Sequence, residues 1–316
     1  MEYLHVFQDF RESAPQFINL IFVIISEAII YVAPVVPALI FLCIDKDMGA
    51  FGIFSVSAAN AISNTIKVTA CVYRPWIKDP TLHPYSAIES SATGYSFPSG
   101  HTTFGTGLYG SIIVMLNKNK KRIAQVIFGI LLLLTGFARM YLGAHTIYDV
   151  GTAIILSLFV VFLMNILVKY LKEHPEKDVW VLVITTVVTV AALIYMWFKK
   201  YPLDTDAAGA YLADPVTMAK DGFGAFGLLF GAVLSWFVER RWINFDIKGK
   251  KSMVILRGVV GTIIFALFYL VISKKIALLF EIRVGAFIRY FITAIVSLMI
   301  YPLIIKLIQT KTKKEG

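Results

Sequence analysis

Long apolar segments separated by short polar ones run through the whole sequence. Nine of them approach the length of a membrane span, at residues 18–43, 50–72, 102–116, 123–142, 147–168, 179–198, 223–238, 254–272 and 284–308. About 20 helical residues are enough to cross the hydrocarbon core of a bilayer. The pattern therefore predicts an all-α protein, a polytopic transmembrane helical bundle of about nine spans, in which 102–116 and 223–238 are the shortest.

The composition points to the same class. Of the 316 residues, 58% are hydrophobic and 16% are charged, and the mean hydropathy is +0.75, whereas soluble domains carry about 25% charged residues. The N-terminus lacks the basic start, short apolar core and cleavage site of a signal peptide, so the first apolar segment is expected to remain as a span. Cys43 and Cys71 lie in or at the ends of apolar segments, and their number and placement predict neither a disulfide framework nor a zinc site.

The positive charge is distributed in alternate loops. The net charge is +10, but the cations form no continuous patch, so no nucleic-acid partner is predicted. They follow the third, fifth, seventh and ninth segments, as Lys118, Lys120, Lys121 and Arg122, then Lys169, Lys172 and Lys177, then Arg240, Arg241, Lys248, Lys250 and Lys251, and finally Lys311, Lys313 and Lys314. By the positive-inside rule these loops are cytoplasmic, which places the C-terminus inside and the N-terminus outside.

Two cations lie at the end of the second apolar segment, in the sequence KVTACVYRP. Lys67 and Arg74 are seven residues apart, close to two helical turns, so they share a helix face, and Pro75 ends the helix. A lysine in or at the edge of a membrane span is costly and suggests a functional site. The alternative is that both side chains snorkel to the interface and bind lipid headgroups.

Two further polar motifs follow. The sequence YSFPSGH, residues 95–101, brings a tight turn and His101 to the start of the third segment, where free N–H groups can bind an anion. The sequence ARMYLGAHTIYD, residues 138–149, places His145 and Asp149 four residues apart on one helix face, six residues after Arg139. A carboxylate there can fix the tautomer of the imidazole. The alternative for this pair is an intramembrane proton relay.

In the topology predicted from charge, these three motifs meet on the outer face of the membrane. The loops after the second and the fourth segments both lie on that side. Three cations, two histidines, one carboxylate and a group of backbone amides are what a phosphate site with a nucleophile requires. His5, His83 and His174 fall in terminal or loop segments, and no role is predicted for them.

The three motifs and their order resemble the signature of the type 2 phosphatidic acid phosphatase superfamily. The matching residues are Lys67, Arg74 and Pro75, then Pro98, Ser99, Gly100 and His101, and then Arg139, His145 and Asp149. The resemblance covers about residues 50 to 165. One departure is Ala138, because many members have a serine before the arginine of the third motif. Nine spans and an external N-terminus are more similar to the glucose-6-phosphatase and sphingosine-phosphate phosphatase branch than to the six-span bacterial enzymes.

The resemblance implies a fold, roles and a substrate class. It implies a phosphatase helical core in residues 1–175 and additional transmembrane helices in 176–316. His145 would be the nucleophile that forms a phosphohistidine, Asp149 would orient it, and His101 would be the general acid and base. The phosphate would be bound by Lys67, Arg74, Ser99, Gly100 and Arg139. No metal site and no cofactor are expected, because the cations can supply the electrostatic stabilisation.

The predicted activity is therefore the metal-independent hydrolysis of a lipid phosphomonoester or diphosphate. Membrane lipids are the expected partners and a lipid phosphate the expected substrate, with the active site on the extracytoplasmic face. The Lys- and Ile-rich composition favours a bacterial inner membrane, whereas nine-span relatives suit an endoplasmic reticulum membrane. The alternatives are a lipid-linked phosphotransferase, a sugar-phosphate phosphatase, and a transporter with polar residues such as Glu27, Asn60, Asn64 and Arg289 in its spans.

Overall fold

The computed structural model describes residues 1–89, 92, 94–117 and 121–315, with side chains up to residue 311. Its described elements are helices, and a single antiparallel bridge joins Thr205 to Tyr211 in a loop. The predicted all-α class is confirmed. Lys118 and Lys120, and the side chains of Lys313 and Lys314, which contributed to the charge pattern, lie outside the described part of the chain.

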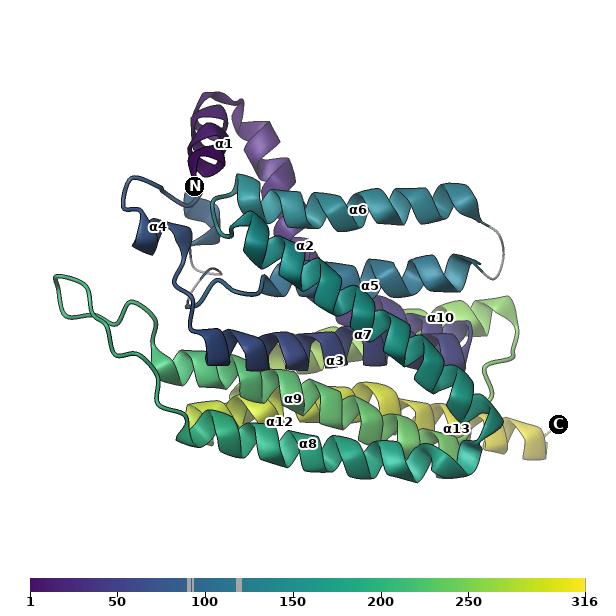
Figure 1. Ribbon diagram of the computed structural model, residues 1–316. Coiled ribbons are helices and arrows are strands. Elements are labelled where there is room, and N and C mark those ends of the chain that lie inside the picture. The colour runs from purple at the N-terminus through teal and green to yellow at the C-terminus, as the bar shows by residue number, and fades with distance from the viewer. Residues whose placement is uncertain (90–91, 93, 118–120, 316) are drawn as a thin grey trace. The chain divides into compact units, whose positions relative to one another are not determined.

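Ten longer helices and several short ones make up the described part of the chain (Figure 1). The longer helices are α2 (Gln16–Cys43), α3 (Lys46–Ala70), α5 (Gly100–Asn117), α6 (Arg122–Tyr141), α7 (Ile147–Glu173), α8 (Asp178–Phe198), α9 (Pro215–Val238), α10 (Lys251–Leu267), α12 (Ile282–Ile295) and α13 (Tyr301–Glu315). The short helices are α1 (Glu2–Ser13), α4 (Pro75–Lys78) and α11 (Ser273–Ala277). Short 3₁₀ turns lie at Ser86–Ile88 and Pro175–Lys177, and π turns at Glu239–Ile243, Phe268–Ile272 and Val296–Ile300.

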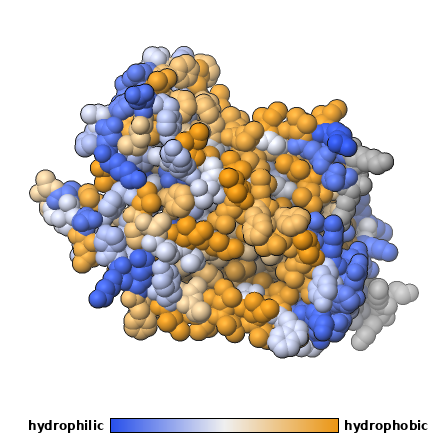
Figure 2. Space-filling view, in the orientation of Figure 1, coloured by the Kyte–Doolittle hydropathy of each residue, from blue (hydrophilic) through white to orange (hydrophobic). Residues whose placement is uncertain are grey.

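Helices form over all nine predicted segments, but seven helical stretches of the described chain are long and apolar enough to cross a membrane. These are Gln16–Cys43, Arg122–Tyr141, Ile147–Glu173, Pro175–Phe198, Pro215–Ile243, Lys251–Ala277 and Ile282–Lys311. Nine spans are therefore not shown. The reason is composition: the middle of α3 contains the polar residues Ser55, Ser57, Asn60, Ser63 and Asn64, and α5 has four glycines and three threonines among its 18 residues. Hydrophobic side chains cover much of the visible surface (Figure 2), as expected for an integral membrane protein.

The chain forms two compact units that alternate along the sequence. The first consists of Met1–Ala33, Ala59–Phe162 and Phe198–Ala219, and the second of Pro34–Ala58, Leu163–Trp197 and Lys220–Gly316. All residues of the three predicted motifs lie in the first unit. The division of function at residue 175 stays a prediction.

In the first unit, α1 links the segments that carry the predicted motifs. The buried guanidinium of Arg11 donates to the carbonyl oxygens of Tyr141, at 2.9 Å, and His83, at 2.5 Å. The hydroxyl of Tyr3 accepts from the backbone N–H of Ile147 at 2.9 Å, and His5 lies 3.0 Å from the carboxylate of Asp79. This helix thus holds the loop after α4 and the turn between α6 and α7. The contacts of His5 and the His83 carbonyl have no counterpart in the sequence analysis.

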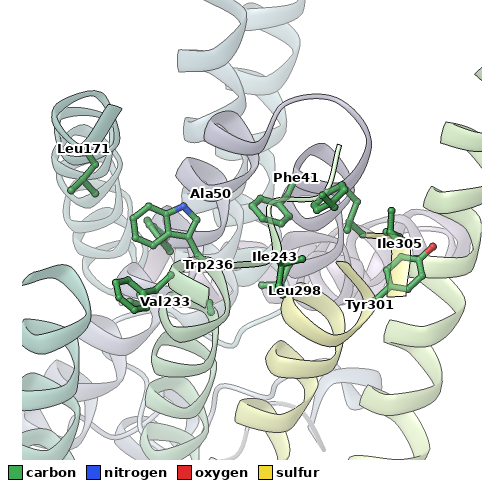
Figure 3. Packing of buried hydrophobic residues seen from close by; sticks show 14 residues of the cluster. Phe41, Ala50, Leu171, Val233, Trp236, Ile243, Leu298, Tyr301 and Ile305 are labelled. Carbon is green, nitrogen blue, oxygen red and sulfur yellow. The ribbon is translucent and has the colours of Figure 1, made fainter. Parts of the chain in front are cut away.

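The second unit has a conventional hydrophobic core. Trp236 meets Phe54 edge to face, with ring centroids 5.2 Å apart. Figure 3 shows part of the same cluster, with Trp236 and Val233 from α9 and Leu171 from α7. Helix α9 approaches α12 closely, since a Cβ on Gly227 would lie 2.3 Å from the carbonyl oxygen of Phe287. Small residues at such contacts are typical of membrane helix packing.

Candidate active site

The two cations of the first motif are buried and bind backbone carbonyls. Lys67, at the end of α3, is 9% exposed, and its Nζ donates to the carbonyl oxygens of Pro98 at 2.7 Å and Tyr95 at 3.1 Å. Arg74 donates from Nε to the carbonyl of Gly94 at 3.0 Å and from Nη1 to that of Ala144 at 2.9 Å. Both side chains therefore point into the protein, which does not fit the alternative of snorkelling toward lipid headgroups.

The second motif forms the N-terminal end of α5. The backbone N–H of Ser99 donates to the carbonyl of Asp149 at 3.1 Å, and the Ser99 hydroxyl accepts from Thr102 at 2.9 Å. A Cβ built on Gly100 would meet no described heavy atom within 4 Å. The turn is thus held by the third motif, while the space beside Gly100 is open and a ligand oxygen could approach the helix start.

The third motif begins with a fully buried arginine. Arg139, in the last turn of α6, has 0% exposure. Its Nη1 donates to the hydroxyl of Ser26 at 2.7 Å and to the carboxylate of Glu27 at 2.9 Å. Nε and Nη2 have no hydrogen-bond partner among the described residues. Buried donors are almost always satisfied in native structures, so these two N–H groups are suited to bind an oxyanion.

Ala138 changes how this arginine is held. Ala138 is fully buried and offers no hydroxyl. The hydroxyl that contacts Arg139 comes instead from Ser26 of α2, far away in the sequence. A side chain from another helix thus supplies the hydroxyl that Ala138 lacks.

His145 follows the turn that ends α6, where Gly143 adopts a positive φ of 77°, as glycine readily does. Its Nε2 lies 2.9 Å from Nη1 of Arg74. Its Nδ1 lies 3.7 Å from Oδ2 of Asp149, which is longer than a hydrogen bond. The carboxylate of Asp149 accepts instead from the N–H of Thr146 at 2.7 Å and from Ser96 at 3.3 Å. The structure thus brings His145 and Asp149 together, as their spacing predicts, without a direct hydrogen bond.

The surroundings of His145 favour the neutral imidazole. Burial is the largest cause, and the positive charges of Arg74, Arg139 and Lys67 add to it, so the pKa of His145 lies well below its ordinary value. A neutral imidazole has a lone pair and can act as a nucleophile.

Glu27 is a site residue that the sequence analysis placed elsewhere. Its Oε1 lies 3.3 Å from Nε2 of His101 and 2.9 Å from Arg139. The sequence analysis used Glu27 to support a transporter. The signal that could have placed it in the site was its position, a carboxylate inside an otherwise apolar segment, which is costly without a partner.

A cavity of about 530 Å³ opens beside Arg74 in the same unit. Its lining is mixed, and includes Trp76, Ile77, Leu212 and Met218 as apolar groups and Asp214 as a polar one. Because Arg74 also contacts His145, the cavity adjoins the predicted nucleophile. It offers space for the part of a substrate that is attached to the reacting group.

Together these residues form a buried, cation-rich site with two imidazoles. The described residues contain no group of three or more His, Cys, Asp or Glu side chains that could hold a metal ion. Lys67, Arg74 and Arg139 supply positive charge, and Arg139 supplies two unpaired donors. Such a set suits a tetrahedral oxyanion, in particular a phosphoryl group.

Comparison with known proteins gives two matches to one superfamily. Residues 50–173 match the PAP2 superfamily, and residues 223–313 match the transmembrane extension of PAP2 superfamily phosphatases. Among curated proteins, phosphatidylglycerophosphatase B of Bacillus subtilis (strain 168) is 30% identical over 112 residues, which cover 34% of this chain and 54% of that protein. The chain thus matches about half the length of this relative. No solved structure matches.

The first match contains all three motifs, and the second covers most of the helices after α8. The resemblance drawn from the motifs is therefore confirmed by an independent comparison. The chain belongs to the PAP2 superfamily of membrane phosphatases and carries the transmembrane extension of that family.

Proposed function

We propose that this protein hydrolyses the phosphate ester of a membrane lipid through a phosphohistidine on His145. The observation that carries the proposal is the position of the His145 imidazole beside Arg74, in a buried site where Arg139 has two unpaired donors. The relative named phosphatidylglycerophosphatase B supports a lipid substrate. Seven candidate spans support a site that a lipid reaches by lateral diffusion.

The first chemical step forms the covalent intermediate. Nε2 of His145 attacks phosphorus in line, so a P–N bond forms as the P–O ester bond breaks. His101 gives a proton to the departing alkoxide. Lys67, Arg74, Arg139, Ser99 and the Gly100 amide stabilise the charge on the equatorial oxygens. Asp149 stabilises the imidazolium that develops on His145.

The second step releases phosphate. His101, now neutral, takes a proton from water as the water oxygen bonds to phosphorus and the P–N bond breaks. The products are the lipid alcohol and inorganic phosphate, and both histidines return to their starting states. If a hydroxyl of a lipid or sugar replaces water, the same site is a phosphotransferase, which is the alternative within this mechanism.

The cavity beside Arg74 supports a substrate with a bulky, partly apolar leaving group. Trp76, Ile77 and Met218 suit the glycerol backbone and upper chains of a lipid better than they suit a sugar. Phosphatidate, phosphatidylglycerophosphate, isoprenyl diphosphate and sphingoid phosphates all belong to this class. A sugar phosphate is the alternative substrate. A transporter is the remote alternative, since polar side chains in the spans are also found there.

We also propose that the site faces the extracytoplasmic side, in a bacterial inner membrane. Helix α6 has Arg122 at its first residue and Arg139 in its last turn. At 1.5 Å per residue these two are about 26 Å apart, close to the thickness of the hydrocarbon core. The basic end, with Lys121 and Arg122, is cytoplasmic by the positive-inside rule, so the opposite end carries Arg139 and the turn with His145 to the outside.

Substitution of the histidines tests the mechanism. We expect His145→Ala to abolish phosphate release, because the nitrogen that attacks phosphorus is lost. His101→Ala should lower kcat by about 10² to 10⁴, the usual contribution of a general acid, and Asp149→Asn should be milder than His145→Ala. Phosphate release by purified protein in detergent measures these effects. His174→Ala, at the exposed end of α7, is the control, and full activity in His145→Ala would contradict the mechanism.

The low pKa of His145 gives a pH dependence. The nucleophile is the neutral ring, and its pKa in the folded protein is lowered, so it stays neutral as the pH falls through the ordinary histidine range near about 6.5. In a plot of kcat/KM against pH, the fall on the acid side that is caused by protonation of His145, the acid limb, should therefore lie well below that range. In Arg74→Gln the limb should move to higher pH, because one cation is lost. An acid limb at the ordinary histidine value in the wild type would contradict this prediction.

A substrate panel tests the proposed class. Phosphate release is measured from phosphatidic acid, phosphatidylglycerophosphate, undecaprenyl diphosphate, sphingosine phosphate and glucose 6-phosphate, with and without a chelator. We expect a clear preference for one of the lipids, no loss with the chelator, and inhibition by vanadate, which mimics the trigonal-bipyramidal phosphoryl group. A preference for glucose 6-phosphate would overturn the lipid class, and activity lost with a chelator and restored by Mg²⁺ would contradict a cation-only site.

The orientation is tested by labelling single cysteines. Thr81→Cys and Lys121→Cys, both at exposed positions, are placed in a chain without Cys43 and Cys71 and expressed in bacteria. A membrane-impermeant thiol reagent added to intact cells should label position 81 and not position 121. The reverse pattern would show that the site faces the cytoplasm.

A further inference from the structure

Helix α2 brings two adjacent polar residues, Ser26 and Glu27, to the active site. Both belong to the first compact unit, like the three motifs. They lie outside residues 50–173 and 223–313, the two stretches that match the superfamily. Ser26 is fully buried, and the side chain of Glu27 is 27% exposed. The superfamily match therefore accounts for the three motifs but not for these two side chains.

The contacts of the pair converge on one nitrogen of Arg139. Nη1 of Arg139 donates to the Ser26 hydroxyl at 2.7 Å and to Oε1 of Glu27 at 2.9 Å, and the Ser26 hydroxyl in turn donates to Oε1 of Glu27 at 3.3 Å. One end of the guanidinium is thus held by two oxygens. Because the guanidinium is planar and rigid, this fixes the direction of Nε and Nη2, the two donors without a partner among the described residues.

The same carboxylate oxygen reaches the second histidine. Oε1 of Glu27 lies 3.3 Å from Nε2 of His101. At this distance the two groups meet the ion-pair criterion, although Nε2 of His101 has no hydrogen-bond partner among the described residues. A carboxylate so close to one ring nitrogen attracts the protonated form of the imidazole. Glu27 is therefore related to His101 as Asp149 is to His145.

We propose that Glu27 is a positioning residue for both Arg139 and His101, and that Ser26 is a positioning residue for Arg139. The proposal rests on the proposed function, with His101 as the proton donor. In the first step the P–O bond breaks and the proton of His101 moves to the leaving oxygen, and in the second step His101 takes a proton from water. Glu27 stabilises the protonated ring before the first transfer and after the second.

The two positions can be told apart by the leaving group. An alkyl leaving group needs a proton as the P–O bond breaks, whereas p-nitrophenolate leaves without one. A residue that acts through His101 matters more for an alkyl ester. A residue that acts only through Arg139 matters equally for both esters, because Arg139 binds the phosphoryl group that they share.

The experiment compares kcat for a short-chain phosphatidic acid and for p-nitrophenyl phosphate in four variants. Glu27→Gln should lose at least about tenfold more activity on the alkyl ester than on the aryl ester, and His101→Ala should show the same difference on a larger scale. Ser26→Ala should lose activity to the same extent on both. Glu27→Asp, which restores the charge, should recover part of the alkyl activity. Glu173→Gln, at the exposed end of α7, is the matched control and should behave as wild type.

Two results would overturn the proposal. Equal losses on both esters in Glu27→Gln would reduce Glu27 to a structural role. If Glu27→Gln kept the wild-type kcat and bound vanadate more tightly, Glu27 would instead compete with the phosphoryl group for Arg139. In both cases an active wild type that is inactivated by His145→Ala leaves the proposed function standing. A wild type that releases no phosphate from either ester would be a failure of the proposed function itself.

Discussion

The buried guanidinium of Arg139 is the group on which the site depends. Burial of a charge is costly unless the charge is paired and its donors are satisfied. Here a serine and a glutamate of α2 satisfy one nitrogen, and two donors are left over. A phosphoryl group would accept from both donors, and these hydrogen bonds would contribute to binding of the substrate and of its transition state.

The loops that carry the other residues are tied together mainly through backbone carbonyls. Lys67 holds the carbonyls of Tyr95 and Pro98, and Arg74 holds those of Gly94 and Ala144. The N–H of Ser99 reaches the carbonyl of Asp149. Each of the three motifs thus contacts another. Such cross-links keep the reacting groups in fixed geometry, which is a large part of catalysis in phosphoryl transfer.

Lys67 and Arg74 have both a structural and an electrostatic role in this site. Lys67 and Arg74 fix the loop before α5 and the turn after α6, and they also surround His145 with positive charge, which, with burial, keeps its ring neutral. Removal of either would disturb structure and charge together. The N-terminal helix α1 adds a further constraint, since Arg11 binds the carbonyls of Tyr141 and His83 on either side of the site.

The sequence by itself determined the helical class, the membrane location and the family, because apolar length and the spacing of ten motif residues are local properties. Spacing along one helix also placed Asp149 beside His145. The tertiary structure decided what joins distant segments: Ser26 at Nη1 of Arg139, Glu27 between Arg139 and His101, and Arg74 at Nε2 of His145. Periodicity cannot predict these contacts, because each joins segments that are far apart in the sequence. For the same reason the sequence alone could not assign Glu27 to the phosphate site, because its partners Arg139 and His101 are distant in the sequence.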